Sequence, residues 1–104
     1  TEEKPDQLRA YVDQNLTNPA LSLSMVAEAF HLQPSNMSKL FKNQYQMRFI
    51  DYVSNRRIEL AKKLLMENKL DVAAIARSVG YDSDVTFRRV FKKITGISPT
   101  QYRS

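Results

Sequence analysis

Apolar side chains recur along the whole chain at the three- and four-residue spacing of amphipathic helices. The first such stripe consists of Leu8, Tyr11, Val12 and Leu16. No segment of convincing length alternates apolar and polar residues, as a half-exposed strand would. The pattern therefore predicts an all-α fold.

Capping and turn-forming residues divide this pattern into seven helices. Ser22, Asp71 and Ser98 are placed as N-caps, and Pro5 and Pro34 suit a first turn. The predicted elements run from Pro5 to Leu16, from Ser22 to Phe30, from Pro34 to Tyr45, over 49–68, from Asp71 to Gly80, from Ser83 to Gly96 and from Ser98 to Tyr102.

The stripes also predict which side chains are buried. In the third helix we expect an inward face of Met37, Leu40, Phe41 and Tyr45. In the sixth helix we expect Phe87, Val90, Phe91 and Ile94. These aromatic residues are typical of a hydrophobic core rather than a base-stacking platform, because they fall on the inward stripe.

The chain repeats itself with a shift of about fifty residues. Residues 23–32 match 72–81 with a shift of 49, and after the turn residues 37–52 match 87–102 with a shift of 50. Each copy is a short capped helix, a tight turn and a second helix, which is a helix-turn-helix unit. We expect a first subdomain at 1–48, a linker helix at 49–68 and a second subdomain at 69–104.

Basic residues are concentrated in the second half of the chain. The net charge is +5 overall, −1 for residues 1–52 and +6 for residues 53–104. This distribution favours a polyanionic partner. A helical protein-interaction module with a cationic face is the alternative, and a solvated charged surface is the third explanation.

Other functions find little support in the composition. The chain has no Cys, one His and two Gly, which excludes disulfides, thiolate zinc sites and phosphate-binding glycine loops. We expect no enzymatic activity, no cofactor and no metal, and a turn role for His31. No apolar run approaches a membrane span, so we expect no membrane partner. The chain begins at Thr1 rather than Met, and we expect it to be part of a longer protein.

The second helix of each unit carries the candidate site, because its width suits the DNA major groove. Residues at its start should reach base edges, and those near its end should lie by phosphates. The exposed faces comprise Ser35, Asn36, Ser38, Lys39 and Lys42 in the first copy and Asp84, Val85, Arg88, Arg89 and Lys92 in the second. Helices about 34 Å apart would enter successive major-groove faces.

For several of these residues the sequence is consistent with two different roles. Arg88 and Arg89 point in different directions on a helix, so one is expected to contact guanine and the other a phosphate or an acid. Asp84 either accepts from cytosine or serves the helix N-terminus. Val85 either touches a thymine methyl group or is simply exposed. In the linker, we expect Arg57 to form a structural ion pair.

The sequence resembles the DNA-binding domain of the arabinose-regulator (AraC/XylS) family of bacterial transcription factors. The resemblance covers nearly the whole chain from Ser22. It rests on the segments RIELAKKLL at 57–65, IARSVGY at 75–81, FRRVFKK at 87–93 and GISPTQYR at 96–103. It implies seven helices, two helix-turn-helix subdomains, a linker helix and sequence-specific binding to promoter DNA.

Residue roles follow from the resemblance by position. It implies base contacts from Ser35, Asn36, Ser38, Lys39, Asp84, Val85, Arg88 and Arg89, and phosphate contacts are expected from Lys42, Lys92 and Lys93. The family usually has Gly where this chain has Gln46, and often Arg where it has Lys39. The resemblance further implies a cytoplasmic, nucleoid-associated regulator, usually an activator. RNA polymerase is then a second candidate partner, and any oligomerisation is expected to use regions outside this chain.

Overall fold

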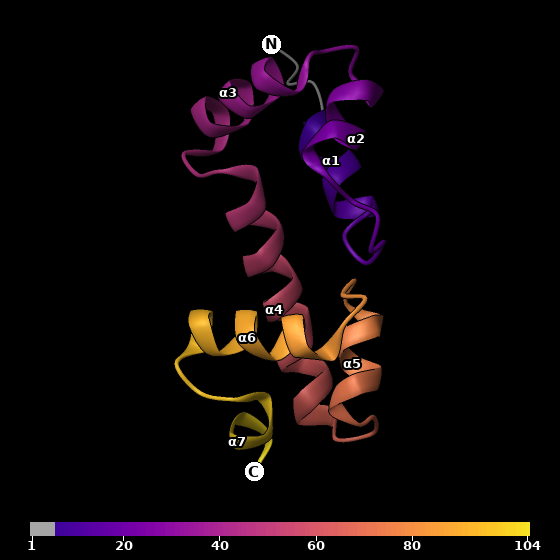
Figure 1. The fold of residues 1–104 in the computed structure, drawn as a ribbon, viewed down its shortest axis with the longest axis vertical. Helices are drawn as coiled ribbons and strands as arrows, with labels where there is room; N and C mark the ends of the chain where they lie inside the picture. Colours follow the sequence, from indigo (N-terminus) through magenta and orange to yellow (C-terminus); the bar gives the residue numbers. More distant parts are fainter. Residues whose placement is uncertain (1–5) are drawn as a thin grey trace.

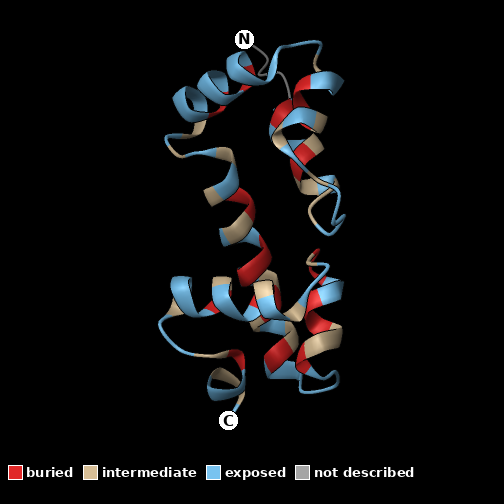
Figure 2. Ribbon diagram, in the orientation of Figure 1, coloured by how far each residue is buried: buried red, intermediate tan, exposed pale blue. Residues whose placement is uncertain are grey.

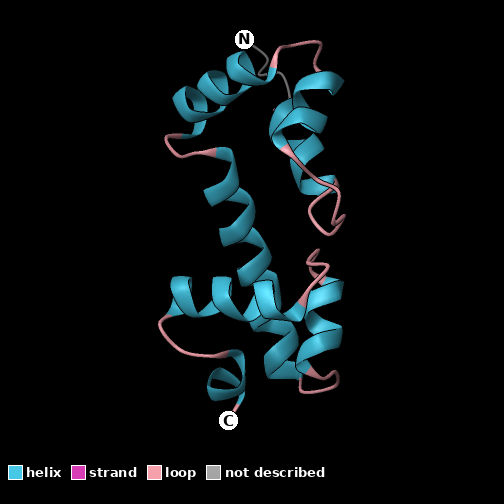
Figure 3. Ribbon diagram, viewed as in Figure 1, coloured by secondary structure: helices cyan, strands magenta, loops and turns pink. Residues whose placement is uncertain are grey.

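The computed structural model describes residues 6–104, which form seven α-helices and no strand (Figure 1 and Figure 3). The prediction of an all-α, seven-helix fold is confirmed, while the expected role of Pro5 lies outside the described residues. The helices are α1 (Gln7–Gln14), α2 (Leu23–Ala29), α3 (Pro34–Tyr45), α4 (Phe49–Glu67), α5 (Val72–Ser78), α6 (Asp84–Thr95) and α7 (Pro99–Arg103).

Side-chain caps begin α2, α5 and α7 at the residues that the sequence predicts. The Ser22 hydroxyl accepts a hydrogen bond from the backbone N–H of Met25 at 3.1 Å. The Asp71 carboxylate caps α5 in the same way, and Ser98 forms a reciprocal capping box in α7. These bonds satisfy N–H groups that have no partner within the helix.

The long helix α4 connects two groups of helices. It runs along the long axis of a molecule measuring 46 × 30 × 21 Å, with α1–α3 at one end and α5–α7 at the other (Figure 1). Helices α3 and α6 both cross this axis, and their chains run in the same sense (Figure 1). The repeated sequence therefore gives two similarly oriented helices, one near each end of α4.

Each group of helices has its own core, and α4 contributes to both (Figure 2). Tyr52 and Val53 from its first half pack with Phe41 in the first core. Ile58 and Leu65 from its second half belong to the second core, where Phe87 and Phe91 are fully buried. Since one rigid helix enters both cores, it links the positions of the two groups.

Two predicted core residues are exposed. Leu40 of α3 is 41% exposed and Ile94 of α6 is 38% exposed, whereas Phe41 and Phe91 have no exposed surface. The prediction of an inward Leu40 and Ile94 is therefore wrong. Each of these helices packs against its neighbours through a narrow stripe, and residues at the edge of the stripe reach solvent.

No helix of residues 6–104 has both the length and the apolar character that crossing a bilayer requires.

Candidate nucleic-acid interface

The two helix-turn-helix units share one turn geometry. After α2, the Leu32 N–H donates to the Ala27 carbonyl at 2.8 Å, and after α5 the Tyr81 N–H donates to the Ala76 carbonyl at 2.9 Å. The residues between, His31 (φ 59°) and Gly80 (φ 113°), both have a left-handed backbone. This closure is typical of a helix C-terminus. His31 thus has the turn role expected for it.

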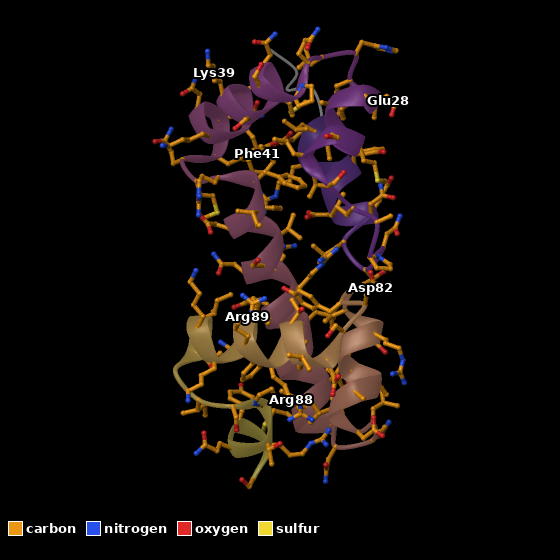
Figure 4. The ribbon with its side chains drawn as sticks, in the orientation of Figure 1. Glu28, Lys39, Phe41, Asp82, Arg88 and Arg89 are labelled. Carbon is orange, nitrogen blue, oxygen red and sulfur yellow. The ribbon has the colours of Figure 1, made fainter. Side chains whose placement is uncertain are left out.

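The start of α3 presents small polar side chains and then two lysines. All five residues predicted for the first motif are exposed, namely Ser35, Asn36, Ser38, Lys39 and Lys42. The helix contains no Asp or Glu. Lys39 lies on the outer side of α3 (Figure 4). Neither lysine has a carboxylate partner among residues 6–104, so both charges remain available.

The outer face of α6 is more strongly basic. Its exposed residues include Arg89, Lys92 and Lys93, none of which pairs with a carboxylate among the described residues. Val85 lies one turn before Arg89 and is 71% exposed. Because the two cores bury the opposite faces of α3 and α6, both helices offer a free polar surface.

The adjacent arginines of α6 have different surroundings. Arg88 Nε lies 3.6 Å from Asp84 Oδ2, one turn earlier on the helix. Arg89 projects from the other edge of α6 (Figure 4). The N-cap of α6 is Ser83, whose hydroxyl accepts from the N–H groups of Val85 and Thr86. In the free protein Arg88 is thus paired with an acid, while Ser83 supplies the side-chain cap and Asp84 places a carboxylate in the first turn of α6.

A groove of about 770 Å³ lies between α3 and α6, with α4 along it. Ser38 of α3 and Thr86, Arg89 and Lys93 of α6 line it. The set of site residues predicted from the sequence does not include Thr86, although its spacing of three residues from Arg89 places it on the same helix face. The groove thus has one candidate residue of α3, Ser38, on one side and Arg89 and Lys93 of α6 on the other.

Arg48 is a second groove residue that the sequence prediction missed. It is the N-cap residue of α4, and its Nε lies 3.0 Å from Asp51 Oδ2. The Asp51 carboxylate raises the pKa of the Arg48 guanidinium. The ion pair partly neutralises this end of the groove. The other groove cations, Arg57, Arg89 and Lys93, have no carboxylate partner among the described residues, and of these Arg57 is buried.

No cluster of three His, Asp or Glu side chains suited to a metal ion occurs between residues 6 and 104.

Comparison with known proteins places the chain in a family. A sequence model of a helix-turn-helix domain matches residues 26–104. The arabinose operon regulatory protein of Salmonella typhimurium is 35% identical over 94 residues, which is 90% of this chain. The chain belongs to the AraC family of transcription regulators, as a helix-turn-helix DNA-binding domain. It covers 34% of the length of the Salmonella regulator.

Two solved structures resemble this AraC-family domain closely. One is the C-terminal domain of the two-component response regulator yesN of Fusobacterium nucleatum, with a TM-score of 0.93, 31% identity and coverage of 95% of this chain and 96% of that chain. The other is the C-terminal domain of AraT, a response regulator of Geobacillus stearothermophilus, with a TM-score of 0.91, 33% identity and coverage of 99% and 87%.

This chain has Gln46 where the AraC family usually has Gly, yet the end of α3 is closed in the same way as the end of α6. Gln46 has a left-handed backbone (φ 60°), and its N–H donates to the Lys42 carbonyl at 2.8 Å. Gly96 ends α6 with the matching bond to Lys92 at 2.8 Å. The Gln46 side chain adds a bond from Nε2 to the Asn43 carbonyl. The helix exit is therefore as tight as that of α6, but a residue with a side chain adopts it.

Arg57 differs from its predicted role in this AraC-family domain. It is buried, and its guanidinium donates to the carbonyls of Leu16 and Asn18 instead of pairing with an acid. The expected structural ion pair is thus wrong. These two carbonyls of the α1–α2 loop point toward α4, and the sequence gives no signal of this.

Proposed function

We propose that this domain binds a specific DNA duplex by placing α3 and α6 in two successive major-groove faces. The observation that carries the proposal is the pair of exposed helices that run in the same sense across α4, with Lys39 and Arg89 at corresponding positions of the repeat. A molecule 46 Å long can hold two elements one DNA turn, about 34 Å, apart.

The proposed roles follow the position of each residue on its helix. Side chains of the first turns contact base edges, and lysines farther along contact phosphates. We assign base contacts to Ser35, Asn36, Ser38, Lys39, Asp84, Val85, Arg88 and Arg89, and phosphate contacts to Lys42, Lys92 and Lys93. Arg89 is the strongest candidate for guanine, because it has no carboxylate partner among the described residues and its planar fork matches O6 and N7.

The geometry favours duplex DNA over an acidic protein partner. Two copies of one unit, similarly oriented, suit a ligand that repeats its own shape along an axis, and duplex DNA does so every turn. The cationic faces fit a protein surface less specifically. A protein contact, with RNA polymerase as the candidate partner, remains the second proposed function.

The remaining proposals concern the whole protein. The arabinose operon regulatory protein suggests a promoter-binding regulator, with activation as its mode of action and the bacterial cytoplasm and nucleoid as its location. We propose that 1–48 and 69–104 act as the two DNA-binding subdomains around the 49–68 linker, and that oligomerisation uses regions beyond this chain. In this proposal the domain acts by binding and performs no catalysis.

Two variants separate base contacts from phosphate contacts. Arg89→Ala should weaken binding to the preferred duplex by about 1–3 kcal/mol, and it should weaken binding to a scrambled duplex much less. Lys92→Ala should weaken both duplexes alike and lower the salt slope by about one. The measurement is a titration of each variant with both duplexes, after selection of the preferred site from random sequences.

Both variants should fold normally, since neither residue lies in a core. Equal losses on the two duplexes for Arg89→Ala would make it a phosphate contact, and base recognition would then rest on Arg88, Asp84 or Val85. Absence of any duplex binding by the wild-type chain would overturn the proposed function.

A further inference from the structure

We propose that Arg57 is a positioning residue for DNA recognition, which fixes the two helix-turn-helix motifs relative to each other and so sets the spacing of the two half-sites. It does so without touching DNA. The consequence for half-site spacing rests on the proposed function, whereas the coupling of the two motifs is a property of the free protein.

The Arg57 side chain connects the two halves of the molecule. Nε donates to the Leu16 carbonyl at 2.8 Å, and Nη2 donates to the Asn18 carbonyl at 2.9 Å. On the other side the guanidinium carbon lies 5.1 Å from the centre of the Tyr81 ring. Leu16 and Asn18 belong to the α1–α2 loop, and Tyr81 belongs to the α5–α6 turn. A single side chain therefore contacts both groups of helices.

Arg57 lies where α4 passes from one core to the other. Val53 packs in the first core and Ile58 packs in the second. The α1–α2 loop and the α5–α6 turn approach each other beside this point (Figure 1). Without a contact here, the bending of α4 would be the main determinant of how α3 and α6 are oriented.

Gly80 gives independent evidence of this contact. A Cβ at Gly80 would lie 2.7 Å from Arg57 Nε and 2.8 Å from the Leu16 carbonyl oxygen. His31 occupies the corresponding turn in the first motif and has a left-handed backbone as well. The first turn thus accepts a side chain at φ 59°, whereas φ 113° at Gly80 would strain any residue with a Cβ. The additional requirement for Gly at position 80 is the close approach of Arg57 and the α1–α2 loop.

The chemistry of the guanidinium makes this contact specific. Arg57 is only 8% exposed, and its burial lowers the pKa of the guanidinium. A buried cation is costly unless its donors are satisfied. Its two carbonyl acceptors lie on the α1–α2 loop, so moving this loop away would leave the buried guanidinium without hydrogen-bond acceptors. The planar fork can serve both acceptors at once, and a lysine ammonium cannot reproduce that geometry.

The first test measures the coupling in the free protein. Because the chain has no cysteine, Glu28→Cys in α2 and Glu67→Cys at the end of α4 accept one spin label each. We expect a narrow distance distribution between the labels in the otherwise wild-type chain. Arg57→Lys should broaden the distance distribution, while the amide NMR spectrum should show that both cores remain folded.

Arg56→Lys is the matched control. Arg56 is exposed, and its Nη2 lies 3.7 Å from Asp13 Oδ2, within the first group of helices. The same conservative change one residue away should leave the distance distribution narrow. An equally narrow distribution in Arg57→Lys would overturn the proposal. Loss of the folded spectrum in either core would also overturn it, because Arg57 would then be a core residue of that subdomain.

The second test measures half-site spacing. The preferred duplex is compared with one in which a single base pair is inserted between the half-sites, which rotates one half-site away from its helix. The insertion should weaken wild-type binding by about tenfold or more, as a lost base contact would. Arg57→Lys should bind the preferred duplex less tightly and discriminate between the two duplexes several-fold less than Arg56→Lys does.

The outcomes of the two tests distinguish a failure of the proposed function from a failure of the positioning role. If no duplex binds to the wild-type chain, the proposed function is wrong, and the spin-label distances still decide whether Arg57 couples the motifs. If duplexes bind but Arg57→Lys keeps the full wild-type discrimination, the positioning role is wrong and the proposed function stands.

Discussion

Gln46 and Gly96 occupy corresponding positions at the ends of α3 and α6, and both have a left-handed backbone. For a residue with a Cβ this conformation costs about 1–2 kcal/mol, whereas glycine adopts it freely. The bond of Gln46 Nε2 to the Asn43 carbonyl lies in solvent and offsets little of this cost. Gln46 is therefore a local strain in the first motif.

Replacing Gln46 should stabilise the protein. We expect Gln46→Gly to raise the free energy of unfolding by about 1 kcal/mol, which corresponds to about 4–8 °C in melting temperature for a chain of this size. Thermal melting followed by circular dichroism measures the change. Gly96→Ala is the reciprocal control and should destabilise the protein, because alanine is strained in a left-handed backbone. A Cβ at this position meets no atom within 4 Å, so the change measures the backbone strain alone. A lower melting temperature for Gln46→Gly would contradict the strain argument.

Asp6 makes a contact whose strength depends on pH. The Tyr45 hydroxyl lies 2.6 and 2.8 Å from the two Asp6 carboxylate oxygens, which joins the start of α1 to the end of α3. This hydrogen bond lowers the pKa of Asp6 below its ordinary value of 3.8. Burial, followed by the Asp6 carboxylate, raises the pKa of Tyr45.

The sign of the pH effect follows from the lowered pKa. The stability from this contact is fully present above pH 3.8, the unfolded-state value, and is lost as the pH falls through the lower folded-state pKa. Urea denaturation from pH 6 down to pH 3 should show a steeper loss for the wild type than for Asp6→Asn. Asn keeps the N-cap function but cannot ionise, so the difference reports the ionisation of Asp6.

Tyr45→Phe is the matched variant for this pH effect. It removes the hydrogen bond and keeps the packing of the ring on Phe41, whose centroid lies 4.6 Å away. Its pH dependence should lie between those of the wild type and Asp6→Asn, because the Arg9 N–H still lowers the pKa of Asp6. A wild-type profile in Tyr45→Phe would mean that the Asp6–Tyr45 contact does not contribute to stability.

At the scale of the element, α6 is held by a stripe of two phenylalanines. Phe87 and Phe91 are fully buried, and Phe91 packs edge-on against Tyr102 of α7 with the ring centroids 5.6 Å apart. Ile94 lies on the next turn but at the edge of the stripe, where it is 38% exposed. The narrow buried stripe leaves most of the circumference of α6 exposed to solvent.

Phe91→Ala should therefore destabilise the second core. We expect a loss of about 3–5 kcal/mol, the usual cost of removing a buried phenylalanine, measured by chemical denaturation. Ile94→Ala is the control and should cost about 1 kcal/mol or less, because much of its surface is already in water. Equal costs for the two variants would mean that the helix is rotated from the observed orientation.

At the scale of the whole molecule, positive charge is distributed unevenly between the two motifs. The outer face of α3 carries Lys39 and Lys42, and that of α6 carries Arg89, Lys92 and Lys93. The second half of the sequence has a net charge of +6. If both faces lie on DNA, the second motif should supply more of the electrostatic affinity.

The affinity for duplex DNA should fall steeply with salt, because bound phosphates release counterions. The three lysines assigned to phosphates alone should give a logarithmic slope of about −2.7, at about 0.9 per contact. Fluorescence anisotropy titrations between 50 and 200 mM salt measure it. Lys92→Ala and Lys93→Ala should each reduce the slope by about one. A flat affinity over this range would contradict binding through these cationic faces.

Local sequence signals determined most of the architecture. The spacing of apolar residues predicts each helix, the caps at Ser22, Asp71 and Ser98 mark three starts, and the repeat predicts two similar motifs. These features depend on interactions within a few residues, namely helix periodicity and capping bonds. The exposed polar faces of α3 and α6 follow from the same periodicity.

Only the tertiary structure decided the features that depend on distant segments. The exposure of Leu40 and Ile94 depends on how each helix rotates against its neighbours, and the acceptors of Arg57 are carbonyls 39 and 41 residues away. Backbone carbonyls occur at every residue, so no sequence pattern marks which of them will face a buried guanidinium. The sequence by itself thus determined two helix-turn-helix units and their exposed faces. Their relative orientation depends on packing across α4, which the sequence does not reveal because the groups that meet there are far apart in the chain.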